Sequence, residues 1–134
     1  MTTRILMSAS AAFLAALGVG ITFLPQELSA HVGAPPEGAA VLAMQLLGAL
    51  YLGFAMLNWM NRGNRIGGIY GRPVSMANFF HFFVGALALL KGFVGHPPAP
   101  ETAAIAAAYS VFAAWFGWVM FTHPGDVAPA GTGS

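Results

Sequence analysis

Chemistry in this chain would have to come from a few polar side chains that lie within otherwise apolar segments. Asn78 and His81 lie three residues apart, on one face of the helix expected over residues 74–94. Asn58 lies near the end of the preceding apolar segment. With a rise of about 1.5 Å per residue, all three lie roughly 5–10 Å inside the same boundary of their helices. We therefore expect them to form one polar cluster.

Two interpretations of this cluster stay open. An ionisable residue inside a membrane is a functional candidate, because leaving it without a partner in hydrocarbon is costly. In the alternative, a neutral His81 hydrogen-bonds Asn58 or Asn78 and joins two helices. The second interpretation is favoured, since a neutral histidine needs no charged partner.

A second candidate is the connection over residues 61–73, which holds three arginines and several glycines. Arg62, Arg65 and Arg72 could bind an anionic group, for which a lipid head-group phosphate is the natural ligand. The loop is not a nucleotide-binding P-loop, because it lacks the Gly-Lys-Ser/Thr ending. The simpler interpretation, which we favour, is that the arginines mark the cytoplasmic side and the glycines form turns.

No catalytic residue, metal site or cofactor is predicted. Haem usually needs two axial ligands at similar depth, and His31, His96 and His123 lie at or beyond the ends of the apolar segments. A second His81 from a symmetric dimer could supply the missing ligand, but nothing requires it. The chain has no cysteine, which excludes thiolate catalysis and cysteine-ligated clusters. We therefore expect that the protein is not an enzyme.

The elements that must position these residues are four long apolar segments, at residues 5–24, 39–60, 74–94 and 102–121. Each reaches the ~20 residues that a helix needs to cross a bilayer. Only 7% of the chain is charged and 57% is hydrophobic, whereas soluble domains carry roughly 25% charged residues. The net charge of +1 provides no basic field for a nucleic acid. The composition therefore predicts a membrane protein.

Helices are predicted rather than strands, because the segments are about twice as long as a barrel strand and do not alternate. Prolines lie at their boundaries, at Pro25, Pro73 and Pro124 and in two proline-rich connections. We expect an all-α fold, a four-helix bundle that forms a single domain over residues 1–126. Residues 127–134 are rich in Pro, Gly, Ala, Ser and Thr and are predicted to be disordered. The first segment is too long for the apolar core of a signal peptide and is expected to be retained.

The basic residues predict the orientation. Arg4, Arg62, Arg65 and Arg72 would lie on one side of the membrane, with Lys91 near the other. The positive-inside rule then places both termini in the cytoplasm.

Small residues recur every four positions in three of the segments. This spacing lets helices approach closely where lipid gives no hydrophobic drive for association. Packing within the bundle is the favoured interpretation, and a dimer interface is the alternative. The residues are Ala12, Ala16 and Gly20; Ala49 and Gly53; and Ala106, Ser110 and Ala114.

Residues 23–27, 45–53, 58–59 and 67–73 read FLPQE, QLLGALYLG, NW and GGIYGRP. Together with the four apolar segments, they make the whole chain resemble a family of small bacterial four-span membrane proteins of unknown function, loosely similar to DoxX-like proteins. The resemblance implies an inner-membrane helical bundle. It supplies no catalytic residues.

These observations favour a non-enzymatic integral membrane protein. We expect an accessory or structural subunit that packs against lipids, other membrane proteins or copies of itself, for example in a respiratory or photosynthetic complex. The alternative is a small carrier or binder of a lipid, a quinone or another apolar ligand.

Overall fold

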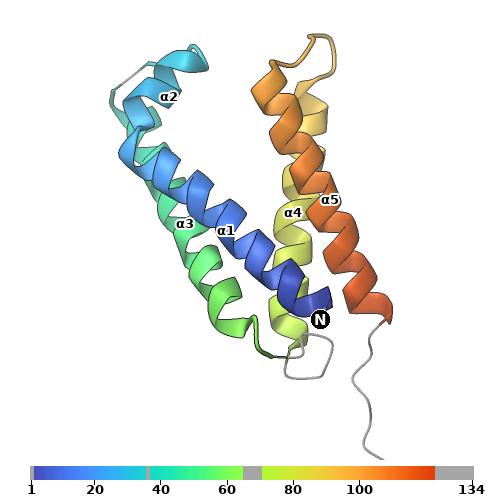
Figure 1. Cartoon of the computed structure of the whole chain (residues 1–134). Coiled ribbons are helices and arrows are strands. Elements are labelled where there is room, and N and C mark those ends of the chain that lie inside the picture. Colours follow the sequence, from blue (N-terminus) through green and yellow to red (C-terminus); the bar gives the residue numbers. More distant parts are fainter. Residues whose placement is uncertain (1, 36, 65–70, 123–134) are drawn as a thin grey trace, which may run out of the picture. The chain divides into compact units, whose positions relative to one another are not determined.

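A computed structural model describes residues 2–35, 37–64 and 71–122 of the chain. Its described residues form five helices and no strand, so the predicted all-α fold class is confirmed (Figure 1). The helices are α1 (Thr2–Phe23), α2 (Pro25–His31), α3 (Ala39–Asn61), α4 (Arg72–Gly92) and α5 (Pro100–Thr122). The predicted disordered tail, residues 127–134, lies outside the described residues.

Four of the helices, α1, α3, α4 and α5, are long and apolar enough to cross a membrane. They correspond to the four predicted segments, with ends that differ by only a few residues. The agreement has a physical reason, since proline begins two of these helices. Pro73 and Pro100 occupy the first turns of α4 and α5, where a missing N–H leaves no hydrogen bond unmade.

The chain divides into two compact units, Met1–Gly63 and Asn64–Ser134, which are described separately here. The first unit contains α1, α2 and α3, and the second contains α4 and α5. Within each unit, the two long helices form an antiparallel hairpin (Figure 1). The association of all four spans as one domain stays a prediction.

In the first unit, glycines let α1 and α3 approach closely at two points. A Cβ added at Gly18 would lie 2.9 Å from Leu52 Cγ, and one at Gly48 would clash with the side chain of Thr22. Leu6, Leu14 and Ala55 are buried as well. The hairpin is therefore packed by small residues facing larger ones, as expected for helices in lipid.

Helix α2 is an addition to the predicted elements. Pro25 was expected only to end the first span, but it also occupies the first turn of this seven-residue helix. The hydroxyl of Ser29, which is buried, donates to the carbonyl oxygen of Pro35 at 2.6 Å. This bond holds the connection between α2 and α3 against the end of the short helix.

In the second unit, aromatic rings fill the contact between α4 and α5. The Phe82 ring is stacked on Phe112 and Phe116, with centroid distances of 4.8 and 5.8 Å. Phe82 and Phe116 are both completely buried. Gly117 faces Phe79, where an added Cβ would lie 3.1 Å from the ring.

The repeated small residues of α1 and α3 lie mostly outside the contact within their own hairpin, and their packing against the other helices of the bundle stays a prediction. Ala12 and Ala16 of α1, and Ala49 and Gly53 of α3, are on exposed faces. The close contacts of this hairpin are made instead by Gly18 and Gly48, which face bulky side chains. In α5, Ala106 is buried, Ser110 is partly buried and Ala114 is exposed.

Candidate functional site

The polar contact between the two helices of the second unit joins His81 of α4 to Tyr109 of α5. The Tyr109 hydroxyl oxygen lies 3.3 Å from His81 Nε2, at hydrogen-bonding distance. Either the phenol O–H donates to an unprotonated Nε2, or a protonated Nε2–H donates to the phenol oxygen. Tyr109 is 3% exposed, and His81 is partly buried. The pair is therefore a polar link between two spans in an apolar setting.

Surrounding rings fix the orientation of this pair. His81 packs against Phe82 with a centroid distance of 5.0 Å, and Phe82 in turn meets Tyr109 edge to face at 5.2 Å. Gly85, one turn along α4 from His81, leaves the space that the Tyr109 ring occupies. An alanine at Gly85 would clash with that ring, so the glycine is needed for the contact.

A second polar link lies in the first unit. The side-chain amide of Asn58 donates to the Ser10 hydroxyl at 3.0 Å, and that hydroxyl donates to the carbonyl oxygen of Met7 at 3.1 Å. Asn58 and Ser10 are both completely buried. The link satisfies a buried amide that would otherwise be costly in hydrocarbon.

Asn78 and Ser75 are also completely buried, on the first half of α4. The Asn78 amide donates to the carbonyl oxygen of Val74 at 2.9 Å, and the Ser75 hydroxyl donates to that of Arg72 at 3.1 Å. These bonds run back along the same helix. They satisfy polar groups without adding a reactive one.

The predicted cluster of Asn58, Asn78 and His81 takes its members from both units. Asn58 belongs to α3, whereas Asn78 and His81 belong to α4. Its assembly stays a prediction. Within each unit, one of these residues does contact the facing helix: Asn58 bonds Ser10, and His81 bonds Tyr109.

Two of the three arginines predicted to bind an anion are described. The Arg62 guanidinium lies 3.8 Å above the centre of the Trp59 ring and donates to the Trp59 carbonyl oxygen. Arg72 is the exposed first residue of α4. Arg65 lies outside the described residues. Arg62 is thus held over an aromatic face at the end of α3, which positions its charge.

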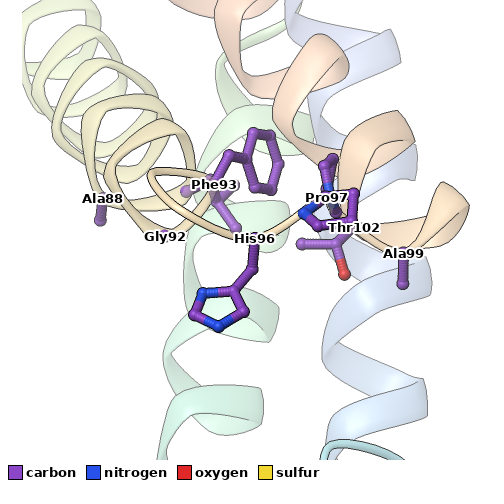
Figure 2. A pocket seen from close by; sticks show the side chains of 9 residues that line it. Ala88, Gly92, Phe93, His96, Pro97, Ala99 and Thr102 are labelled. Carbon is purple, nitrogen blue, oxygen red and sulfur yellow. The ribbon is translucent and has the colours of Figure 1, made fainter.

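A hollow of about 310 Å³ lies where α4 turns into α5 (Figure 2). Its wall combines small residues, such as Ala88 and Gly92, with polar groups on His96 and Thr102. The rings of Phe93 and His96 point away from each other in Figure 2. This volume is near the lower end of the range for ligand pockets, roughly 300–1,000 Å³.

Among the described residues, no group of three His, Asp or Glu side chains is placed to hold a metal ion. The Asn58 and His81 side chains instead bond the facing helix of their hairpin, and the Asn78 amide bonds its own helix. Such an arrangement can hold helices together and can position a neutral histidine.

The sequence analysis identified neither of the two hairpin partners, Ser10 and Tyr109. A signal for each was present. Ser10 and Asn58 lie equally far along the chain from Ala34, and His81 and Tyr109 lie equally far from Gly95. Both midpoints fall in the turns between antiparallel helices, so each pair must lie at one level.

No protein-family model matches the chain, and neither a curated protein nor a solved structure matches it significantly. The resemblance to DoxX-like proteins stays a prediction.

Proposed function

We propose that this protein is a non-enzymatic, multi-pass subunit of a bacterial inner membrane that packs against another membrane protein. In this proposal both termini are cytoplasmic, and the function is structural or accessory, for example within a respiratory or photosynthetic complex. The proposal accords with the resemblance to small DoxX-like membrane proteins.

The observation that carries this proposal is an exposed apolar stripe along α3. Only 11% of the residues in the most apolar stretch of α3 are buried, against 33% of those in α1 and in α5. The stripe residues follow one another at alternating steps of four and three, the spacing of helices packed side by side. They are Leu42, Leu46, Ala49, Gly53, Met56 and Met60, all exposed.

The centre of the stripe has the composition of a helix contact. Ala49 and Gly53 are small, and a Cβ added at Gly53 would meet nothing within 4 Å. Leu46 beside them is 64% exposed. Because lipid tails are as apolar as leucine, close approach at small residues is what drives helices together in a membrane. A partner helix could therefore approach closely at the small residues in the centre of the stripe and pack against the larger side chains at its ends.

The arrangement of the polar groups supports a structural role. Asn58 and His81 are used in links across their own hairpins, to Ser10 and Tyr109.

Photo-crosslinking in intact membranes tests the proposal. A photoreactive phenylalanine analogue at Gly53 should give one discrete adduct with a polypeptide, because the stripe lies against a partner helix. The same group at Val84, an exposed residue of α4, is the control and should yield mainly lipid adducts. Lipid adducts alone at Gly53 would contradict the proposal.

The alternative proposal is a binder of an apolar or amphipathic ligand such as a quinone. It is supported by the hollow between α4 and α5, where His96 and Thr102 offer polar groups beside an apolar wall (Figure 2). Loss of a co-purifying quinone or lipid in His96→Ala, measured by mass spectrometry, would favour this alternative. Unchanged ligand content would reject it.

A further inference from the structure

The first unit carries a second surface feature, a shallow groove of about 260 Å³ between α1 and α3. It is lined almost entirely by apolar atoms of Ala11, Ala12, Ala15, Leu52, Ala55, Met56 and Trp59. The alanines of α1 create the depth, because larger side chains there would fill the space. An apolar cavity of about 150 Å³ is sufficient to bind benzene, so this groove has room for part of a hydrocarbon chain.

The groove lining extends on α3 to Trp59, near the end of the hairpin where α1 begins and α3 ends. An arginine lies at that end on each helix. Arg4 shares a face of α1 with Ala11 and Ala15, at steps of seven and four residues. On α3, Arg62 is stacked on Trp59, whose side chain lines the groove.

The two arginines also lie at about the same level. In the α1–α3 hairpin, residues equally distant from Ala34 face one another, as Ser10 and Asn58 do. By this register, Arg4 lies level with the residues just after Arg62. Arg4 and Arg62 therefore place two positive charges beyond the same end of the apolar groove.

We propose that this groove binds an anionic phospholipid, with one acyl chain along the alanines of α1 and the phosphate between Arg4 and Arg62. Arginine is suited to phosphate because its planar guanidinium can donate two parallel hydrogen bonds. Acyl chains are as apolar as the groove, so the groove fixes the position of the lipid and the arginines select its head group.

This site goes beyond the proposed subunit function and differs from the predicted loop site in two respects. It uses Arg4, which the loop site did not include, and it joins the charged residues to a place for the acyl chain. It requires that α1 and α3 lie in a bilayer and that the groove faces lipid. Its test has a lipid readout, whereas the test of the subunit function has a polypeptide readout, so the two can fail independently.

The experiment uses the full chain, reconstituted in nanodiscs with equal amounts of phosphatidylglycerol and phosphatidylcholine. Native mass spectrometry then measures the lipids that the released protein retains. We expect phosphatidylglycerol to be retained preferentially. A surface-adjacent basic residue is worth about 1 kcal/mol toward an anionic lipid, so Arg4→Gln and Arg62→Gln should each lower this preference about fivefold.

Two matched controls separate this site from general attraction. Lys91→Gln removes an exposed positive charge from the far end of α4 and should leave the preference unchanged. Ala12→Phe fills the groove and should reduce lipid retention, whereas Ala16→Phe, an exposed position of α1 outside the groove lining, should not.

Equal retention of the two lipids by the natural protein would overturn the proposal. An equal loss of the preference for phosphatidylglycerol in Lys91→Gln would also overturn it. The same holds if a photoreactive group placed at residue 12 forms an adduct with a polypeptide in place of a lipid. Because none of the substituted side chains is buried, each variant is expected to fold.

Discussion

At the scale of single residues, polar side chains in the spans hold each hairpin together. Asn58 bonds Ser10 in the first unit, and His81 bonds Tyr109 in the second. Hydrogen bonds between membrane helices are worth about 0.6 kcal/mol on average, with a maximum near 1.7 kcal/mol. Each link is therefore a modest contribution, and its main effect is to fix which residues of the two helices face each other.

Removing the Ser10 hydroxyl tests the first link. Ser10→Ala takes away the acceptor of a buried amide with little change in volume, so we expect a loss of about 0.6–1.7 kcal/mol in the free energy of unfolding. The Ser10→Ala/Asn58→Ala double variant should lose less than the sum of the single variants. Unfolding by sodium dodecyl sulfate from a mild detergent, followed by circular dichroism, measures these values.

The matched control is Ser110→Ala on α5. Its hydroxyl donates only to Ala106 of its own helix in the contacts described here, at 2.8 Å, so its removal should be close to neutral. Additive losses in the Ser10–Asn58 cycle would show that the two side chains do not interact.

The second link is tested by a cycle of His81→Ala and Tyr109→Phe. Tyr109→Phe keeps the ring packed against Phe82 and removes only the hydroxyl, so we expect a coupling energy of about 0.6 kcal/mol. A cycle of Tyr109→Phe with Leu90→Ala, an exposed residue more than two turns from His81 along α4, should show none. Equal coupling in both cycles is the result that would count against the link.

The candidate residues were predictable from the sequence, but their partners were not identified. An isolated histidine or asparagine in an apolar segment stands out because its burial is costly. Serine and tyrosine are common in such segments, so Ser10 and Tyr109 do not stand out in the same way. Only the antiparallel register, counted from Ala34 and Gly95, points to them, and that count requires the turns to be located first.

At the scale of helices, the contact between α1 and α3 depends on two glycines. Around Gly48, the nearest atoms to an added Cβ include the backbone nitrogen of Thr22 at 2.9 Å and the carbonyl oxygen of Gly18 at 3.0 Å. Backbone atoms cannot rotate away as a flexible side chain can. Any larger residue at this point must therefore push the helices apart.

Gly48→Ala should consequently destabilise the first unit by about 1–3 kcal/mol, the usual cost of overpacking. Gly20→Ala on α1 is the control, because nothing lies within 4 Å of a Cβ added there. It should leave the free energy of unfolding unchanged or raise it, since alanine favours helix. The same denaturation assay applies, and equal effects of the two substitutions would contradict the described contact.

Helix positions were well predicted, whereas the faces on which α1 and α3 meet were not identified. The length of an apolar segment and its flanking prolines locate a span, because both follow from the bilayer and from backbone chemistry. The repeat of Ala12, Ala16 and Gly20 gave no guide to the contact face, since α1 has small residues on several faces. Helix α2 was missed because a proline that ends one helix can also begin the next.

At the scale of the whole molecule, the distribution of charge predicts an orientation that can be measured directly. The chain has no cysteine, so single cysteines can be introduced without background. His31→Cys and Ala99→Cys should react with an impermeant maleimide in intact cells, whereas Gly63→Cys should react only after lysis. All three positions are exposed in the structure. The opposite labelling pattern would reverse the proposed topology.

The exposed stripe of α3 could not be predicted from the sequence. Nearly every residue of a span is apolar, so lipid-facing and protein-facing positions look alike until the hairpin contacts are known. Once Gly48, Ala55 and Asn58 are assigned to the buried face of α3, the face with Ala49 and Gly53 is seen to take no part in the α1–α3 contact.

The most direct measurement of the proposed subunit function is the mass of the protein after extraction in a gentle detergent. Native mass spectrometry of the affinity-purified full chain should give a complex that contains other polypeptides in fixed stoichiometry. Gly53→Phe, which fills the centre of the stripe, should release the chain from that complex, whereas Val84→Phe should not. Recovery of the natural chain as a single monodisperse species, without any other polypeptide, would contradict the account.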